Sequence, residues 1–173
     1  MRHIVTGIAL TVLAAATPVL AADDADAAFA KRIAAGGMAE VEEGKLAQEK
    51  GSSQAVKDFG AMMVKDHSAA NEKLKKIAPG ANVKLPTEPD MKQKASNKML
   101  SMKSGADFDK AYVDAQVKDH EDTVGLLQKE IDSGKNSELK SFASETLPTV
   151  QSHLKMARDL QSGGKGVAAT TRH

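Results

Sequence analysis

The chain has 173 residues, with 24 lysine and arginine residues against 23 aspartate and glutamate residues, a formal net charge of +1 and no cysteine. Without cysteine there are no disulfides, thiolate metal sites, cysteine nucleophile or lipid-modified N-terminal cysteine. Because the charges balance and no basic tract occurs, neither nucleic acid nor an anionic membrane surface is expected as a partner. Helix-forming residues dominate and β-branched residues are sparse, which predicts an all-α protein of one domain.

The first 22 residues have the pattern of a secretory signal peptide. A basic residue precedes the apolar stretch Ile4–Leu20, and small residues stand before an acidic pair. This order predicts cleavage after Ala21 or Ala22, while the alternative is an uncleaved anchor, for which the stretch is slightly short and contains Pro18. We therefore expect the mature protein in the periplasm or secreted, with peripheral outer-membrane association as a further location and no transmembrane segment.

Turn residues divide the mature chain into four long helical segments. Glycine, serine or proline residues follow each of the first three segments, and a Ser-Gly-Gly sequence follows the fourth. Residues of these types commonly end helices. The predicted helices cover about residues 25–50, 53–78, 107–133 and 137–161.

The connection between the second and third helices is long. It covers residues 81–105 and is expected to carry a short helix around 92–102. A single long crossover between two short-turn helix pairs is the order of ferritin-like bundles, so the predicted fold is an all-α, ferritin-like four-helix bundle at 23–161. Pro148, inside the fourth helix, is expected to kink it or restart it. Residues 162–173 are predicted to form a disordered polar tail.

Each of the last three helices carries one histidine in its apolar stripe. His67, His120 and His153 occur among apolar residues spaced three or four apart, which predicts that they face inward. In the first helix, Glu40 has the corresponding register, with Glu43 a turn away. We expect both short turns to lie at one end of the bundle. Measured from that end, the depths of Glu40, His67, His120 and His153 are roughly 16, 22, 21 and 28 Å.

One carboxylate and three imidazoles at similar depth are a ligand set for a single iron, copper or zinc ion. The predicted metal site is therefore Glu40, His67, His120 and His153. Di-iron bundles place a glutamate three residues before a histidine on two helices, but here that position is valine in each case, so a di-iron centre is not expected. A metal-free histidine network and ordinary polar core residues stay open as alternatives.

A repeated string, Val-Lys-Asp-His, places an aspartate directly before two of these histidines. On an ideal helix Asp66 and Asp119 point about 100° away from the histidine that follows. They are expected either to accept a hydrogen bond from a histidine on another helix or to pair with lysines at the surface. No nucleophile elbow or serine–histidine spacing supports a hydrolase, and the sequence does not decide whether the protein is an enzyme.

Four blocks carry a resemblance to a known family. The chain resembles exported bacterial proteins of unknown function, often labelled outer-membrane proteins and placed with the ferritin-like folds. The resemblance spans about residues 29–160 and implies fold and export but no activity. The blocks are Ala34–Glu42 with Gly44–Ala47, Val56–Phe59 with Met63–His67, Phe108–Val113 with Asp119 and His120, and Leu147 and Pro148 with His153.

Two functions are consistent with this pattern. The first is a non-enzymatic periplasmic bundle with a binding, protective or envelope-related role, which includes binding another envelope protein. The second is a metal-binding protein or oxidoreductase that uses the interior glutamate and histidines. The metal content of the purified protein distinguishes these two functions.

Overall fold

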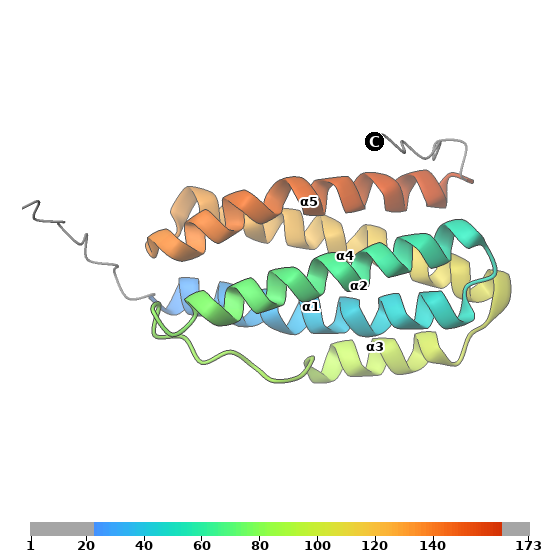
Figure 1. The fold of residues 1–173 in the computed structure, drawn as a ribbon, viewed down its shortest axis with the longest axis horizontal. Helices are drawn as coiled ribbons and strands as arrows, with labels where there is room; N and C mark the ends of the chain where they lie inside the picture. The colour runs from blue at the N-terminus through green and yellow to red at the C-terminus, as the bar shows by residue number, and fades with distance from the viewer. Residues whose placement is uncertain (1–22, 164–173) are drawn as a thin grey trace, which may run out of the picture.

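The computed structural model describes residues 23–163, which form five α-helices (Figure 1). The expected signal peptide at 1–22 and most of the expected tail, 164–173, lie outside the described residues. The all-α prediction is confirmed, and each predicted helix boundary lies within two residues of the observed one. The helices are α1 (Asp24–Lys50), α2 (Gln54–Ile77), α3 (Met91–Ser101), α4 (Gly105–Ser133) and α5 (Ser137–Gln161).

Polar side chains define where several of these helices begin. Asp23, Ser53 and Asn136 each accept hydrogen bonds from backbone N–H groups in the first turn of α1, α2 and α5. At the start of α3, Asp90 and Gln93 form a reciprocal capping box. Each cap satisfies N–H groups that helix geometry leaves without a partner, which explains why the predicted starts were accurate.

Helix α5 continues through Pro148. The expectation that the helix restarts at this residue is therefore wrong. A proline removes the hydrogen bond to the carbonyl four residues earlier, here that of Ser144. Both residues lie on the exposed face of α5, where water can satisfy that carbonyl.

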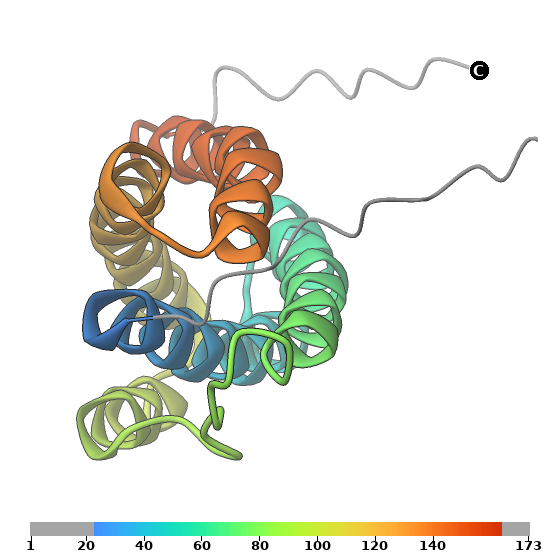
Figure 2. The same cartoon turned by 90° about the vertical axis from the view of Figure 1, so that its left-hand side faces the viewer.

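The four long helices form a bundle, and α3 lies outside it against α1 (Figure 2). α1 packs against α2, and α4 packs against α5, as antiparallel pairs (Figure 1). The α1–α2 pair approaches closely at Gly44 and Gly60, because a Cβ on either residue would lie 2.7 Å from the carbonyl oxygen of the other.

The two short turns lie at opposite ends of the bundle. In the α1–α2 turn, the backbone N–H groups of Ser52 and Ser53 donate to Asp109, near the start of α4, at 2.8 and 2.9 Å. In the α4–α5 turn, two backbone N–H groups donate to Asp26, in the first turn of α1. The premise that both turns share one end is wrong, because the connection that carries α3 spans the bundle and makes α4 parallel to α2.

The bundle interior consists of two apolar clusters with a polar layer between them. One cluster surrounds Phe29, Leu74 and Phe142 near the α4–α5 turn, and the other surrounds Phe59 and Phe108 near the α1–α2 turn. The buried polar side chains between them are Glu40, Glu43, Asn71, Gln116, His120 and His153. Burying so many polar groups in the middle of a bundle costs free energy unless they have partners. A polar layer at this position is therefore the candidate functional region.

Candidate metal centre

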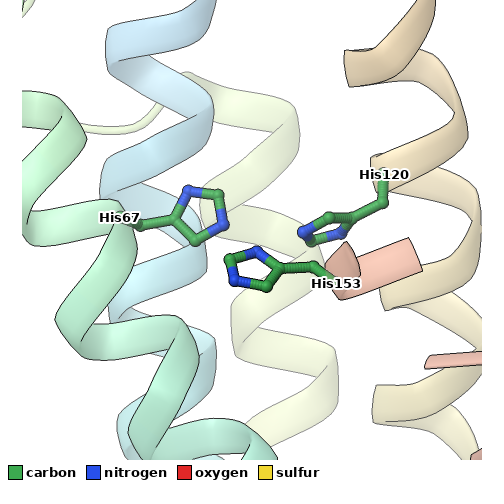
Figure 3. Close-up of side chains that lie close together, drawn as sticks. All are labelled: His67, His120 and His153. Carbon is green, nitrogen blue, oxygen red and sulfur yellow. The ribbon is translucent and has the colours of Figure 1, made fainter. Parts of the chain in front are cut away.

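Three histidines from three helices meet in the polar layer (Figure 3). One ring nitrogen from each of His67 on α2, His120 on α4 and His153 on α5 lies within 4.8 Å of those of the other two. The ring centroids are 5.5 to 5.6 Å apart. Two imidazoles whose nitrogens were more than about 6 Å apart could not share an ion with bonds of ~2.0–2.1 Å, and these nitrogens lie within that limit.

The three histidines converge because of the directions in which their helices run. These directions differ from the ones assumed when the depths were estimated from the sequence. Helices α2 and α4 both begin at the end of the bundle where Asp109 binds the α1–α2 turn. His67 and His120 each lie about four turns into their helices, so they reach the same level. α5 runs in the opposite direction and brings His153 to that level from the other end.

Two of the rings are oriented by hydrogen bonds. Nδ1–H of His120 donates to the backbone carbonyl of Gln116 at 2.9 Å, and Nε2–H of His153 donates to the carboxylate of Asp66 at 3.0 Å. Because a neutral imidazole has one N–H, the other nitrogen of each ring carries a lone pair. These two nitrogens, together with Nε2 of His67, are buried with no hydrogen-bond partner among the described residues.

Burial keeps the three rings neutral. It lowers the pKa of His67 well below its usual range, and the neighbouring imidazoles lower it further. Burial also lowers the pKa of His120 to about 4 and lowers that of His153, although the Asp66 carboxylate acts in the opposite direction. Neutral imidazole is the form that binds metal ions, so burial favours the ligating state.

The predicted carboxylate ligand, Glu40, lies beside this centre in a second cluster. Its Oε1 is 4.0 Å from Nδ1 of His120. Carboxylate oxygens of Glu40, Glu43 and Asp119 lie within 4.8 Å of one another. The side-chain amide of Gln116 donates to an oxygen of Glu40 at 2.6 Å and to one of Glu43 at 2.8 Å. The structure thus groups the three predicted histidines together and places Glu40 with other carboxylates.

The two aspartates of the repeated string have different surroundings. Asp66 follows the first expectation, since it accepts a hydrogen bond from a histidine on another helix. Asp119 belongs instead to the carboxylate cluster, where burial raises its pKa. Identical local sequence therefore supports two different roles, because the neighbouring helices differ.

Two side chains of this layer are not among the residues predicted from the sequence. Gln116 and Tyr112 precede His120 by one and two turns on α4, and both are fully buried. They stand four and eight residues before His120, but the predicted stripe consists of apolar residues and histidines and leaves both out. Reading Tyr112, Gln116 and His120 as one inward row would have found them.

A cavity of about 300 Å³ reaches this layer and is lined by residues of all five helices, among them exposed residues such as Arg32 and Lys92. His67, Glu40, Glu43 and Asp119 line it. Gly36 and Gly37 also line it, and a Cβ on Gly37 would overlap the side chain of Asn71. Solvent, or a small ion, thus has a path to His67 and to the carboxylates.

The sequence matches one family model, that of a domain of unknown function named DUF4142, over residues 11–160. The chain belongs to this family. No curated protein matches the chain. The expected membership of a family of unknown function is confirmed, and none of the described helices is long and apolar enough to cross a membrane.

Two solved structures share the fold. A DUF305 protein from Streptomyces coelicolor, described as a candidate secreted protein, superposes with a TM-score of 0.68 at 15% identity, covering 80% of this chain and 91% of its own. A DUF305 fragment from Deinococcus radiodurans superposes with a TM-score of 0.72 at 9% identity, covering 83% of this chain and 99% of its own. At these identities the likeness establishes a helical bundle and nothing more.

Proposed function

We propose that the chain is an exported metal-binding protein in which His67, His120 and His153 hold one transition-metal ion inside a ferritin-like bundle. One observation carries the proposal. Three buried ring nitrogens from three helices approach one another with no hydrogen-bond partner in the described part of the chain. A buried acceptor without a partner costs about 1–3 kcal/mol, and a shared ion would satisfy all three at once.

The donor set indicates the class of metal. Three neutral imidazoles suit Zn²⁺ or Cu²⁺ and leave at least one coordination position for water or another ligand. The hydrogen bonds from His120 to the Gln116 carbonyl and from His153 to Asp66 are the supporting contacts that orient histidine ligands in metalloproteins. Metal binding is the function that these contacts support.

Export is part of the proposal and has separate support. Residues 1–22 have the order of a secretory signal, which places cleavage after Ala21 or Ala22. A structure with the same fold is described as a candidate secreted protein. The mature chain would then handle its metal in the periplasm or outside the cell, with 23–161 as the binding domain.

Metal binding is tested on the mature chain purified without a polyhistidine tag. We expect about one equivalent of Zn²⁺ or Cu²⁺ by elemental analysis and calorimetry, and a loss of affinity of at least about tenfold on replacing any one of the three histidines by alanine. His173→Ala replaces a histidine that is not one of these three and is the control. Circular dichroism confirms that each variant is folded. Absence of stoichiometric metal after supplementation would overturn the proposal.

A further inference from the structure

We propose a second cation site beside the histidine centre, in which Glu40, Glu43 and Asp119, with the amide oxygen of Gln116, bind a hard divalent cation such as Mn²⁺. The inference uses none of the three histidines as ligands and so goes beyond the proposed function. It rests on the geometry of the carboxylates, on two buried oxygen atoms beside them and on the cavity that reaches them.

The carboxylates are gathered from two helices and held in place. Glu40 and Glu43 are one turn apart on α1, and Asp119 faces them from α4, with oxygens of all three within 4.8 Å of one another. The Gln116 amide binds one oxygen of each glutamate at 2.6 and 2.8 Å. This contact fixes both carboxylates and leaves their other oxygens for a further partner, as a preorganised site requires.

Two buried oxygen atoms lie beside the carboxylates without a partner among residues 23–163. Gln116 is fully buried, and its Oε1 belongs to the same amide that contacts both glutamates. The hydroxyl of Tyr112, also fully buried, lies close enough to Glu40 and Glu43 for their charges to raise its pKa. Buried polar atoms are normally paired, so two unpartnered oxygens in this layer support a ligand that is absent from the described contacts.

The chemistry of the donors selects a hard cation. Three carboxylates and an amide oxygen match the ligands of Mg²⁺, Ca²⁺ and Mn²⁺, whereas imidazoles favour later transition metals. Two different ions would therefore distribute between the two clusters, one on each side of the His120 ring. Burial and the neighbouring carboxylates raise the pKa of Glu40 well above its usual range and that of Glu43 to about 7, and a divalent cation would take the place of the protons that these groups otherwise hold.

The cavity provides entry. Glu40, Glu43 and Asp119 all line it, and Asp119 is the most exposed of the three. Arg32 and Lys92 line the same cavity, so repulsion from these side chains should keep the affinity moderate. A site with this access would load from solution without opening the bundle.

The test uses the mature chain loaded with one equivalent of Zn²⁺ and titrated with Mn²⁺, with free Mn²⁺ measured by electron paramagnetic resonance. We expect one further equivalent to bind, and Glu43→Gln to weaken that binding by at least about tenfold, since loss of a charged ligand lowers cation affinity. Glu49→Gln, an exposed change on the same helix, is the matched control and should bind as the native chain does.

Two further measurements make each outcome decisive. Asp119→Asn, at the half-buried ligand, should weaken Mn²⁺ binding in the same way and serves if Glu43→Gln is unfolded. The titration is repeated without Zn²⁺, so that a failure of the histidine centre to bind zinc does not obscure the result. No Mn²⁺ bound at millimolar concentration, or equal binding by native chain and both variants, overturns the inference.

Discussion

Nε2 of His153 on α5 lies 3.0 Å from Oδ2 of Asp66 on α2. The bond joins two helices and, because a carboxylate only accepts, it fixes the proton on Nε2 and leaves the lone pair on Nδ1. Nδ1 is the buried nitrogen of this ring without a partner in the described chain. The contact therefore determines which atom His153 presents to the other histidines.

Asp66→Asn tests this orienting role. An asparagine can present either its oxygen or its NH₂ group to His153, so the ring no longer has one enforced tautomer. We expect Zn²⁺ affinity, measured by calorimetry, to fall about 10–100-fold while the thermal midpoint of the metal-free protein changes little. Asp58→Asn, an exposed change on the same helix, is the control. Unchanged zinc affinity in Asp66→Asn would show that the hydrogen bond only supports packing.

His120→Leu separates a functional histidine from a structural one. The side chain is 1% exposed and its Nε2 is buried without a partner in the described structure, so leucine removes a desolvated polar atom and adds apolar burial. We expect the metal-free variant to be at least as stable as the native chain in chemical denaturation, and to gain no stability from zinc. A large loss of stability without metal would instead show that the hydrogen bond to Gln116 is structural.

The burial of Glu130 predicts that the stability of the protein depends on pH independently of the metal centre. The residue is 5% exposed, and burial, with Asp26 and Asp23 nearby, raises its pKa to about 7. Since the folded pKa lies above the unfolded one, the contribution to stability is full below the unfolded pKa and is lost as pH rises towards 7. Glu130→Gln should therefore unfold at higher urea than the native chain at pH 8 and at similar urea at pH 4. Glu49→Gln is the exposed control, and an equal shift at both pH values would contradict the assignment.

The helices were predictable because the signals that set them are local. Capping residues such as Asp23 and Ser53 lie directly before apolar residues at helical spacing, and both properties can be read from a short window. The inward register of His67, His120 and His153 follows from the same spacing. These features need no knowledge of which helices are neighbours.

The grouping of the polar residues needed the helix directions, which are not local. The opposite placement of the turns depends on long-range contacts such as Asp26 with the α4–α5 turn. Likewise, Asp66 and Asp119 precede histidines in identical strings, but one faces His153 and the other faces Glu43. Only the packing of α1, α2, α4 and α5 shows that the histidine nitrogens form one cluster and the carboxylate oxygens another.

Gly60 and Gly125 form a matched pair of glycines inside helices. A Cβ at Gly60 would lie 2.7 Å from the Gly44 carbonyl and from the Ala47 side chain, whereas a Cβ at Gly125 meets nothing within 4 Å. Gly60→Ala should therefore force α1 and α2 apart and destabilise the protein by about 1–3 kcal/mol in urea. Gly125→Ala should stabilise it by up to ~1 kcal/mol, because alanine favours the helix.

Since the three histidines depend on α2 keeping its distance from α4 and α5, we also expect Gly60→Ala to weaken zinc binding and Gly125→Ala to leave it unchanged. Equal effects of the two substitutions on stability would show that close α1–α2 packing does not require a glycine at position 60.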